Sequence, residues 1–311
     1  MDDGSIPLAD RPFTRRGLLT MIGAGAALST QRVERTSVSD EPVSIRVYPG
    51  SLPPLAWTWY RLTATDTGWP PPFEASLEAI RDAFDQLTAY AKRTEDVDLN
   101  VVVERGATVE IPVTSRSSFR GIVSPTQQGL LDAFRDVLSE RGVLNGRSSH
   151  LLLWWGPFDY AVGYGGTRRP NRHVDAVDGA GAQVVANVGA TEWWDSRSVT
   201  RNIAIHEALH TFLAPSVVEQ IVDSRCDHDL GSCVRVDEKT REVSPMATAY
   251  AGPEKVGGDT RFHGTACYDH DSFFRHDGYE GVEQWKHTTK LTEATLEATT
   301  RYVLDRLEYD S

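Results

Sequence analysis

The alternation of apolar and polar residues defines the first part of the chain. Residues 43–48 alternate in the manner of a strand. Residues 73–92 and 126–141 repeat apolar side chains at helical spacing, which predicts two amphipathic helices. Further strands are predicted at 97–103, 151–155, 160–166 and 183–188. This order predicts an α+β fold with an α/β-like N-terminal part, in which helices pack on a sheet.

The remainder of the chain is less regular. A helix is predicted from Ser198, which can cap its start, to the region of Pro215, which limits its end. Residues 214–290 are predicted to be mostly loop, and a terminal helix is predicted at 291–307. Residues 29–42 are polar without an apolar period and are interpreted as a linker. We therefore expect a domain at 43–311, divided into an upper subdomain (43–213) and a lower one (214–311).

The predicted helix before Pro215 carries the sequence His206-Glu207-x-x-His210. Residues four apart lie on one face of a helix, so both imidazoles can reach one zinc ion. Glu207 stands about 100° around the helix from His206, where its carboxylate can bind a water molecule on that ion. Zinc and a carboxylate in this arrangement activate water for hydrolysis. The motif predicts a catalytic metal centre with Glu207 as the general base.

The motif resembles that of the zincin metallopeptidases, and Met246 lies in a segment similar to the Met-containing turn of their metzincin branch. The resemblance implies a zincin-type twisted sheet with packed helices, whose edge strand holds the substrate extended. It also implies an active-site helix and a loop-rich lower subdomain that ends in a helix. It implies one zinc ion per chain and structural support of the site by Met246. Leu213 and Ser216 occupy the positions of the metzincin glycine and third histidine, so we expect a later third ligand or a separate branch.

His228 is the favoured third ligand because it lies between Pro215 and Met246, in a turn that ends at Gly231. A disulfide between Cys226 and Cys233 would hold this turn, although Cys267 could replace either partner. The other candidate ligands are Glu219, Asp223, Asp227, Asp229, His263 and His270.

A second group of acidic and histidine residues follows Met246. It could bind calcium or a second metal, but its spacing matches no standard loop, and a solvated acidic loop is the favoured interpretation. Its members are His263, Asp269, His270, Asp271, His276 and Asp277.

The first residues resemble a twin-arginine export signal. Arg15 and Arg16 precede an uncharged segment at 17–28, which is too short to span a membrane as a helix. Residues 1–28 are therefore interpreted as a signal segment. This predicts an extracellular or cell-surface protein with no stable membrane span once the signal is removed. The sequence does not predict the oligomeric state.

The net charge of -12 argues against a nucleic-acid partner, which would favour a basic face. Many Asp and few Lys residues are typical of proteins from salt-loving organisms. The sequence predicts an exported zinc metallopeptidase that acts on proteins or peptides. Two alternatives remain at this stage: a secreted, non-catalytic protein stabilised by zinc, and a zinc amidase acting on other amide bonds.

Overall fold

The structure is a computed structural model that describes residues 42–61, 68–111, 116–119, 122–168, 181–247, 275–277 and 281–308. The predicted signal segment and linker, up to residue 41, lie outside this description. Within the described ranges, no helix combines the length and apolar composition of a membrane span.

A mixed five-stranded sheet forms the centre of the described domain, in the order β2-β1-β5-β7-β6. Four strands are parallel, and β6 pairs antiparallel with β7 at the edge. The strands are β1 (Val43–Pro49), β2 (Val101–Arg105), β5 (Ser148–Leu153), β6 (Gly165–Thr167) and β7 (Ala182–Ala186). A short hairpin of β3 (Arg116–Phe119) and β4 (Ile122–Pro125) lies outside this sheet.

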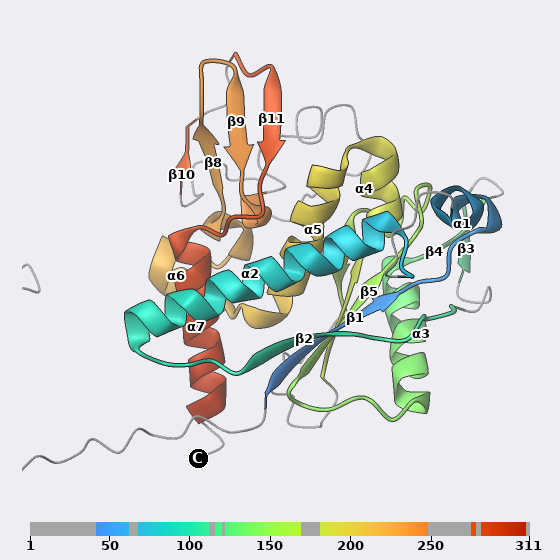
Figure 1. Ribbon diagram of the computed structural model, residues 1–311, viewed down its shortest axis with the longest axis horizontal. Helices are drawn as coiled ribbons and strands as arrows, with labels where there is room; N and C mark the ends of the chain where they lie inside the picture. The colour runs from blue at the N-terminus through green and yellow to red at the C-terminus, as the bar shows by residue number, and fades with distance from the viewer. Residues whose placement is uncertain are drawn as a thin grey trace, which may run out of the picture. The chain divides into compact units, whose positions relative to one another are not determined.

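Helices cover both faces of the sheet, and the alternation along each strand decides which side chains they meet. On one face, Leu151 and Leu153 of β5 belong to the core shared with α2 (Pro71–Glu95), α5 (Arg197–Leu209) and α7 (Glu293–Glu308). Leu152 points to the other face and packs with α3 (Gln127–Glu140). Figure 1 shows α2 and α5 side by side. The predicted combination of a sheet with packed helices is therefore confirmed.

The region after the metal-motif helix contains more regular structure than predicted. The short helix η2 (His210–Phe212) continues α5, and Pro215 begins α6 (Pro215–Val222). A second sheet has the order β10-β8-β9-β11 (Figure 1). Its strands are β8 (Ser232–Arg235), β9 (Thr240–Val243), β10 (Arg275–His276) and β11 (Gln284–His287). The prediction that 214–290 is mostly loop is wrong for these described stretches.

Three smaller differences concern the first part of the chain. Residues 54–61 form a helix, α1 (Pro54–Arg61), where an irregular stretch was expected. The strand predicted at 160–166 is reduced to β6, because residues 157–164 form turns. The strand predicted at 183–188 ends at Ala186, and Val188 begins α4 (Val188–Trp194), whose start is capped by Asn187. Asn187, one residue after the strand, marks the start of this helix by capping it. The pattern of apolar residues alone does not reveal such a cap.

Candidate metal centre

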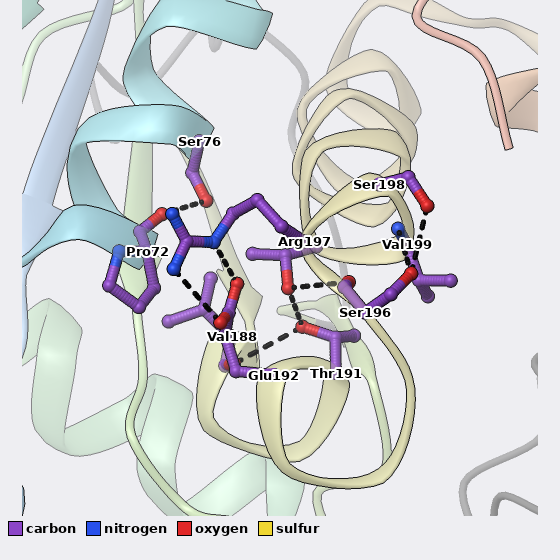
Figure 2. Close-up of polar contacts among 10 residues, drawn as sticks. Pro72, Ser76, Val188, Thr191, Glu192, Ser196, Arg197, Ser198 and Val199 are labelled. Atoms are coloured by element: carbon purple, nitrogen blue, oxygen red, sulfur yellow. Dashed lines mark hydrogen bonds and ion pairs between the residues drawn. The ribbon is translucent and has the colours of Figure 1, made fainter.

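Helix α5 is anchored at its start by the corner that it forms with α4. Ser196, rather than the predicted Ser198, caps the helix: its Oγ accepts from the Val199 amide at 3.5 Å. Figure 2 shows Arg197 reaching back to pair with the carboxylate of Glu192. Between the two helices, the hydroxyls of Thr191 and Thr200 lie 2.8 Å apart. These contacts fix the beginning of the helix that carries His206 and Glu207.

The other end of the metal-motif helix is joined to both sheets. The Thr211 hydroxyl in η2 lies 2.8 Å from that of Ser149 in β5, and both residues are fully buried. Asn202 lies one turn before His206, and its Nδ2 donates to the carbonyls of Val243 at 3.2 Å and Thr288 at 2.8 Å. The helix is therefore tied to the central sheet and to the ends of β9 and β11.

Three histidines converge at this helix. His206 lies in α5, His210 begins η2, and His228 lies in the short helix η3 (Asp227–Leu230). The Nε2 atom of His206 is 2.9 Å from Nε2 of His210 and 3.1 Å from Nε2 of His228. Two nitrogens bound to one tetrahedral zinc ion lie ~3.3 Å apart, given zinc–nitrogen bonds of about 2.0–2.1 Å. The three side chains thus form a group that could hold a metal ion.

The second ring nitrogens of His206 and His210 show which protonation state the rings adopt. His206 Nδ1 is 2.8 Å from the carbonyl oxygen of Pro245, and His210 Nδ1 is 2.6 Å from Asp227 Oδ2. A carbonyl or an ionised carboxylate can only accept, so each Nδ1 carries a proton and donates it. In the neutral imidazole, each Nε2 then presents a lone pair to the centre.

His228 has the same orientation with a different acceptor. Its Nδ1 lies 3.5 Å from Sγ of Cys226, which is disulfide-bonded. A disulfide sulfur has no hydrogen, so Nδ1 is again the donor. Asp227 Oδ1 lies 3.6 Å from the same nitrogen. Three Nε2 atoms that converge in this way can each present a lone pair to a cation that displaces the proton between them, and the donor set fits a metal of the zinc class.

The charges of the site follow from burial and from one ion pair. Burial lowers the pKa of His206 well below 6.5, and it lowers that of His228 to about 4. Burial also lowers the pKa of His210, but the Asp227 carboxylate outweighs it and raises the value to about 9. In return, His210 holds the pKa of Asp227 well below its usual range, against the effect of burial. Without metal, His210 therefore carries the proton of the cluster at neutral pH.

Glu207 lies under the edge of the central sheet. Only 5% of its surface is exposed, and its Oε2 has no hydrogen-bond partner among the described residues. Burial raises the pKa of its carboxyl group to about 7, although the charge of His210 lowers it. A Cβ atom on Gly165 of β6 would lie 2.6 Å from Glu207 Oε1, so only glycine leaves room for this carboxylate. The carboxyl group can thus accept or release a proton near neutral pH.

The turn beside the metal centre is held by close contacts with the segment around Met246. A Cβ atom on Gly231 would lie 2.3 Å from the amide nitrogen of Ala247, which is why the chain needs glycine there. Met246 is fully buried in η4 (Pro245–Ala247), and the residue before it supplies the carbonyl for His206. The structure thus places Met246 next to the residue that contacts His206, and its supporting role stays a prediction.

No model of a known protein family matches the chain, and no curated protein matches it.

One predicted pairing is wrong. Cys226 is disulfide-bonded, but Cys233 is a buried thiol, so these two residues are not bridged to each other. Cys233 lies in β8 with its side chain in a small core beside Val243. Spacing along the chain could not show that Cys233 lies in a strand with its side chain in this core. The third cysteine, Cys267, lies outside the described residues.

The other candidate ligands that the structure describes do not join the three histidines. Glu219 is exposed and pairs with Arg225 at 3.8 Å, and Asp223 ends α6 in the left-handed conformation. Asp229 is buried and accepts from the Ser224 hydroxyl. His263 and His270 lie outside the described residues, as do Asp269 and Asp271 of the suggested calcium loop. Within that group, Asp277 accepts from the Arg235 amide at 2.8 Å and pairs with Arg275.

Three residues that support the site were missed or misjudged from the sequence. Asp227 was considered as a ligand, but its carboxylate binds the outer nitrogen of His210. The Pro245 carbonyl and Gly165 carried no signal in the sequence, because their roles depend on contacts between distant segments. A cavity of about 1070 Å³ lies elsewhere, lined by Trp59, Trp154 and Trp193 among others, and none of the predicted site residues lines it.

Proposed function

We propose that this protein is a zinc-dependent peptidase of the zincin type, exported from the cell. The observation that carries the proposal is the convergence of three imidazole Nε2 atoms beside a buried carboxylate. A metal that serves only structure is normally closed by four protein ligands. Among the described residues, three nitrogens converge, and the side chain of His210 is 16% exposed, which leaves an approach from solvent.

His206, His210 and His228 would hold the ion through their Nε2 atoms. A zinc ion bound there would acidify a water molecule and polarise the scissile carbonyl group of the substrate. Asp227 and the Pro245 carbonyl accept the Nδ1 protons of two of these rings, so that Nε2 is the nitrogen that each ring offers to the ion.

Glu207 supplies the proton transfer. Its Oε2 atom is available to accept a proton from the attacking water and to pass it to the leaving amide nitrogen. A carboxyl group whose pKa is about 7 can do both at neutral pH. The edge strand β6, which lies against this carboxylate, offers an extended peptide a partner for strand pairing.

The test compares Glu207→Gln with wild type, both loaded with zinc, on an unfolded protein substrate. We expect equal zinc content and a loss of hydrolysis of at least about 100-fold, because an amide cannot take up the proton. Glu219→Gln, which removes an exposed carboxylate on α6, is the matched control and should keep full activity. Full activity in Glu207→Gln would refute the role of Glu207. Wild type that binds zinc but hydrolyses nothing would favour a non-catalytic zinc protein instead.

A further inference from the structure

The segment 226–228 contributes to the metal centre in three different ways. His228 brings one Nε2 atom, and Asp227 orients the ring of His210. Cys226, the first residue of the segment, places its Sγ 3.5 Å from His228 Nδ1 and is disulfide-bonded. Each of the three imidazoles thus has its own acceptor at Nδ1, and for His228 that acceptor is sulfur.

We propose that the disulfide sulfur of Cys226 is a positioning group for the metal centre. By accepting the Nδ1 proton of His228, it fixes the tautomer in which Nε2 bears the lone pair that faces His206. This inference rests on the proposed function only in assuming that the three imidazoles hold a metal ion. It assigns Cys226 a role beyond cross-linking two parts of the chain.

His228 needs such a partner more than the other two histidines do. His206 and His210 lie on one continuous helical segment and have strong oxygen acceptors at 2.8 and 2.6 Å. His228 lies in a single short turn of four residues. Another acceptor near this ring, Asp227 Oδ1, belongs to the carboxylate that already holds His210. A His228 ring that turned toward this oxygen would compete with His210 for it.

The sulfur is itself held in place. The backbone amide of Cys226 donates to the Ser224 hydroxyl at 3.1 Å, and its carbonyl accepts from the Asp229 amide at 3.1 Å. The main chain of Cys226 is thus fixed on both sides, and the disulfide restrains its side chain. The His228 ring is buried, with 5% of its surface exposed, so water is a poor substitute for the sulfur.

The experiment measures the zinc dissociation constant of Cys226→Ala and Cys226→Ser, by competition with a chelator. Both variants lose the disulfide, but only serine keeps an acceptor at position 226 for the His228 Nδ1 proton. We expect Cys226→Ala to bind zinc about 10–100-fold more weakly than wild type, the usual effect of losing a group that orients a ligand. Cys226→Ser should recover several-fold of this loss. Cys233→Ala, which removes the cysteine that is not in a disulfide, is the control and should bind as wild type.

Equal zinc affinity in Cys226→Ala and Cys226→Ser would overturn the proposal, whether both match wild type or both are weakened alike. In the second case the disulfide would act as a cross-link only. Far-UV circular dichroism of the metal-free variants shows whether they fold.

A measurement on metal-free wild type does not depend on how the variants fold. Long-range proton–nitrogen NMR of the imidazoles reports which nitrogen of His228 is protonated. The proposal requires Nδ1–H, and an Nε2–H tautomer would overturn it. This result is separate from the peptidase proposal, which fails if wild type binds no zinc or does not hydrolyse peptides.

Discussion

At the scale of single residues, the metal centre depends on which nitrogen of each histidine is protonated. Motif and spacing identify the atoms that can face a metal, but they do not reveal what holds the other side of each ring. Here the partner of His206 is the carbonyl of Pro245, and that of His210 is the carboxylate of Asp227. The partner of His228 is the sulfur of Cys226. Of these, Asp227 has the largest electrostatic effect because it adds a negative charge.

We predict that Asp227→Asn weakens zinc binding by about 10–100-fold. Without the carboxylate, the pKa of His210 should fall from about 9 toward its ordinary value of 6.5. At pH 7.5, His210 is protonated in wild type, so zinc must displace its proton. In Asp227→Asn most molecules have a neutral His210, and zinc binding displaces few protons. Calorimetry in two buffers with different ionisation enthalpies should therefore show about one proton released per zinc in wild type and much less in Asp227→Asn.

Asp223→Asn is the matched control, since Asp223 is exposed and asparagine also tolerates its left-handed conformation. It should leave both affinity and proton release unchanged. Equal proton release in wild type and Asp227→Asn would contradict the ion pair between Asp227 and His210.

At the scale of elements, the site lies where α5, β6, η3 and η4 meet. The sequence predicted α5 and its histidines because the helical period and the motif are both local. It also pointed to His228, since this histidine lies between Pro215 and Met246 in a turn that ends at Gly231. The second sheet was missed because β8 and β9 are only four residues long, and their pairing is decided by segments distant along the chain. The same reason hid Gly165, whose lack of a side chain matters only beside Glu207.

We predict that Gly165→Ala abolishes most of the hydrolytic activity while zinc remains bound. The added methyl group would lie 2.6 Å from Glu207 Oε1 and 2.2 Å from the carbonyl oxygen of Val185, so the carboxylate and the edge of the sheet must both move. Thr167→Ala changes the same strand two residues away and should retain activity. The comparison is made as kcat on a peptide substrate with zinc content measured in parallel. Unchanged kcat in Gly165→Ala would contradict the role of the Glu207 carboxylate beside β6.

At the scale of the whole molecule, the described domain buries histidines in both sheets. His150 of β5 and His287 of β11 have pKa values lowered to about 4, in each case chiefly by burial. Export through Arg15 and Arg16 stays a prediction, because these residues lie outside the described ranges. Tolerance of high salt stays a prediction too, because it is a property of the protein in solution. The buried histidines lead to a test of stability against pH.

The sign of this pH effect follows from the lowered pKa values. Below pH 6.5 the unfolded chain takes up protons that the buried rings accept only near pH 4, so acid favours unfolding across this interval. Each such ring adds up to about 1.4 kcal/mol per pH unit to the loss of stability. We predict that His287→Gln loses stability less steeply than wild type between pH 6.5 and 4.5, measured by urea unfolding of metal-free protein. Parallel profiles would mean that His287 is protonated equally easily in both states.

The central claim is that three histidines hold a zinc ion that keeps a position open for water. X-ray absorption spectroscopy of the zinc-loaded protein tests it most directly, because it reports the number and type of atoms around the metal. The account predicts three imidazole nitrogens and one additional oxygen at about 2.0–2.1 Å. A fourth imidazole or a sulfur ligand would contradict it, as would the absence of stoichiometric zinc.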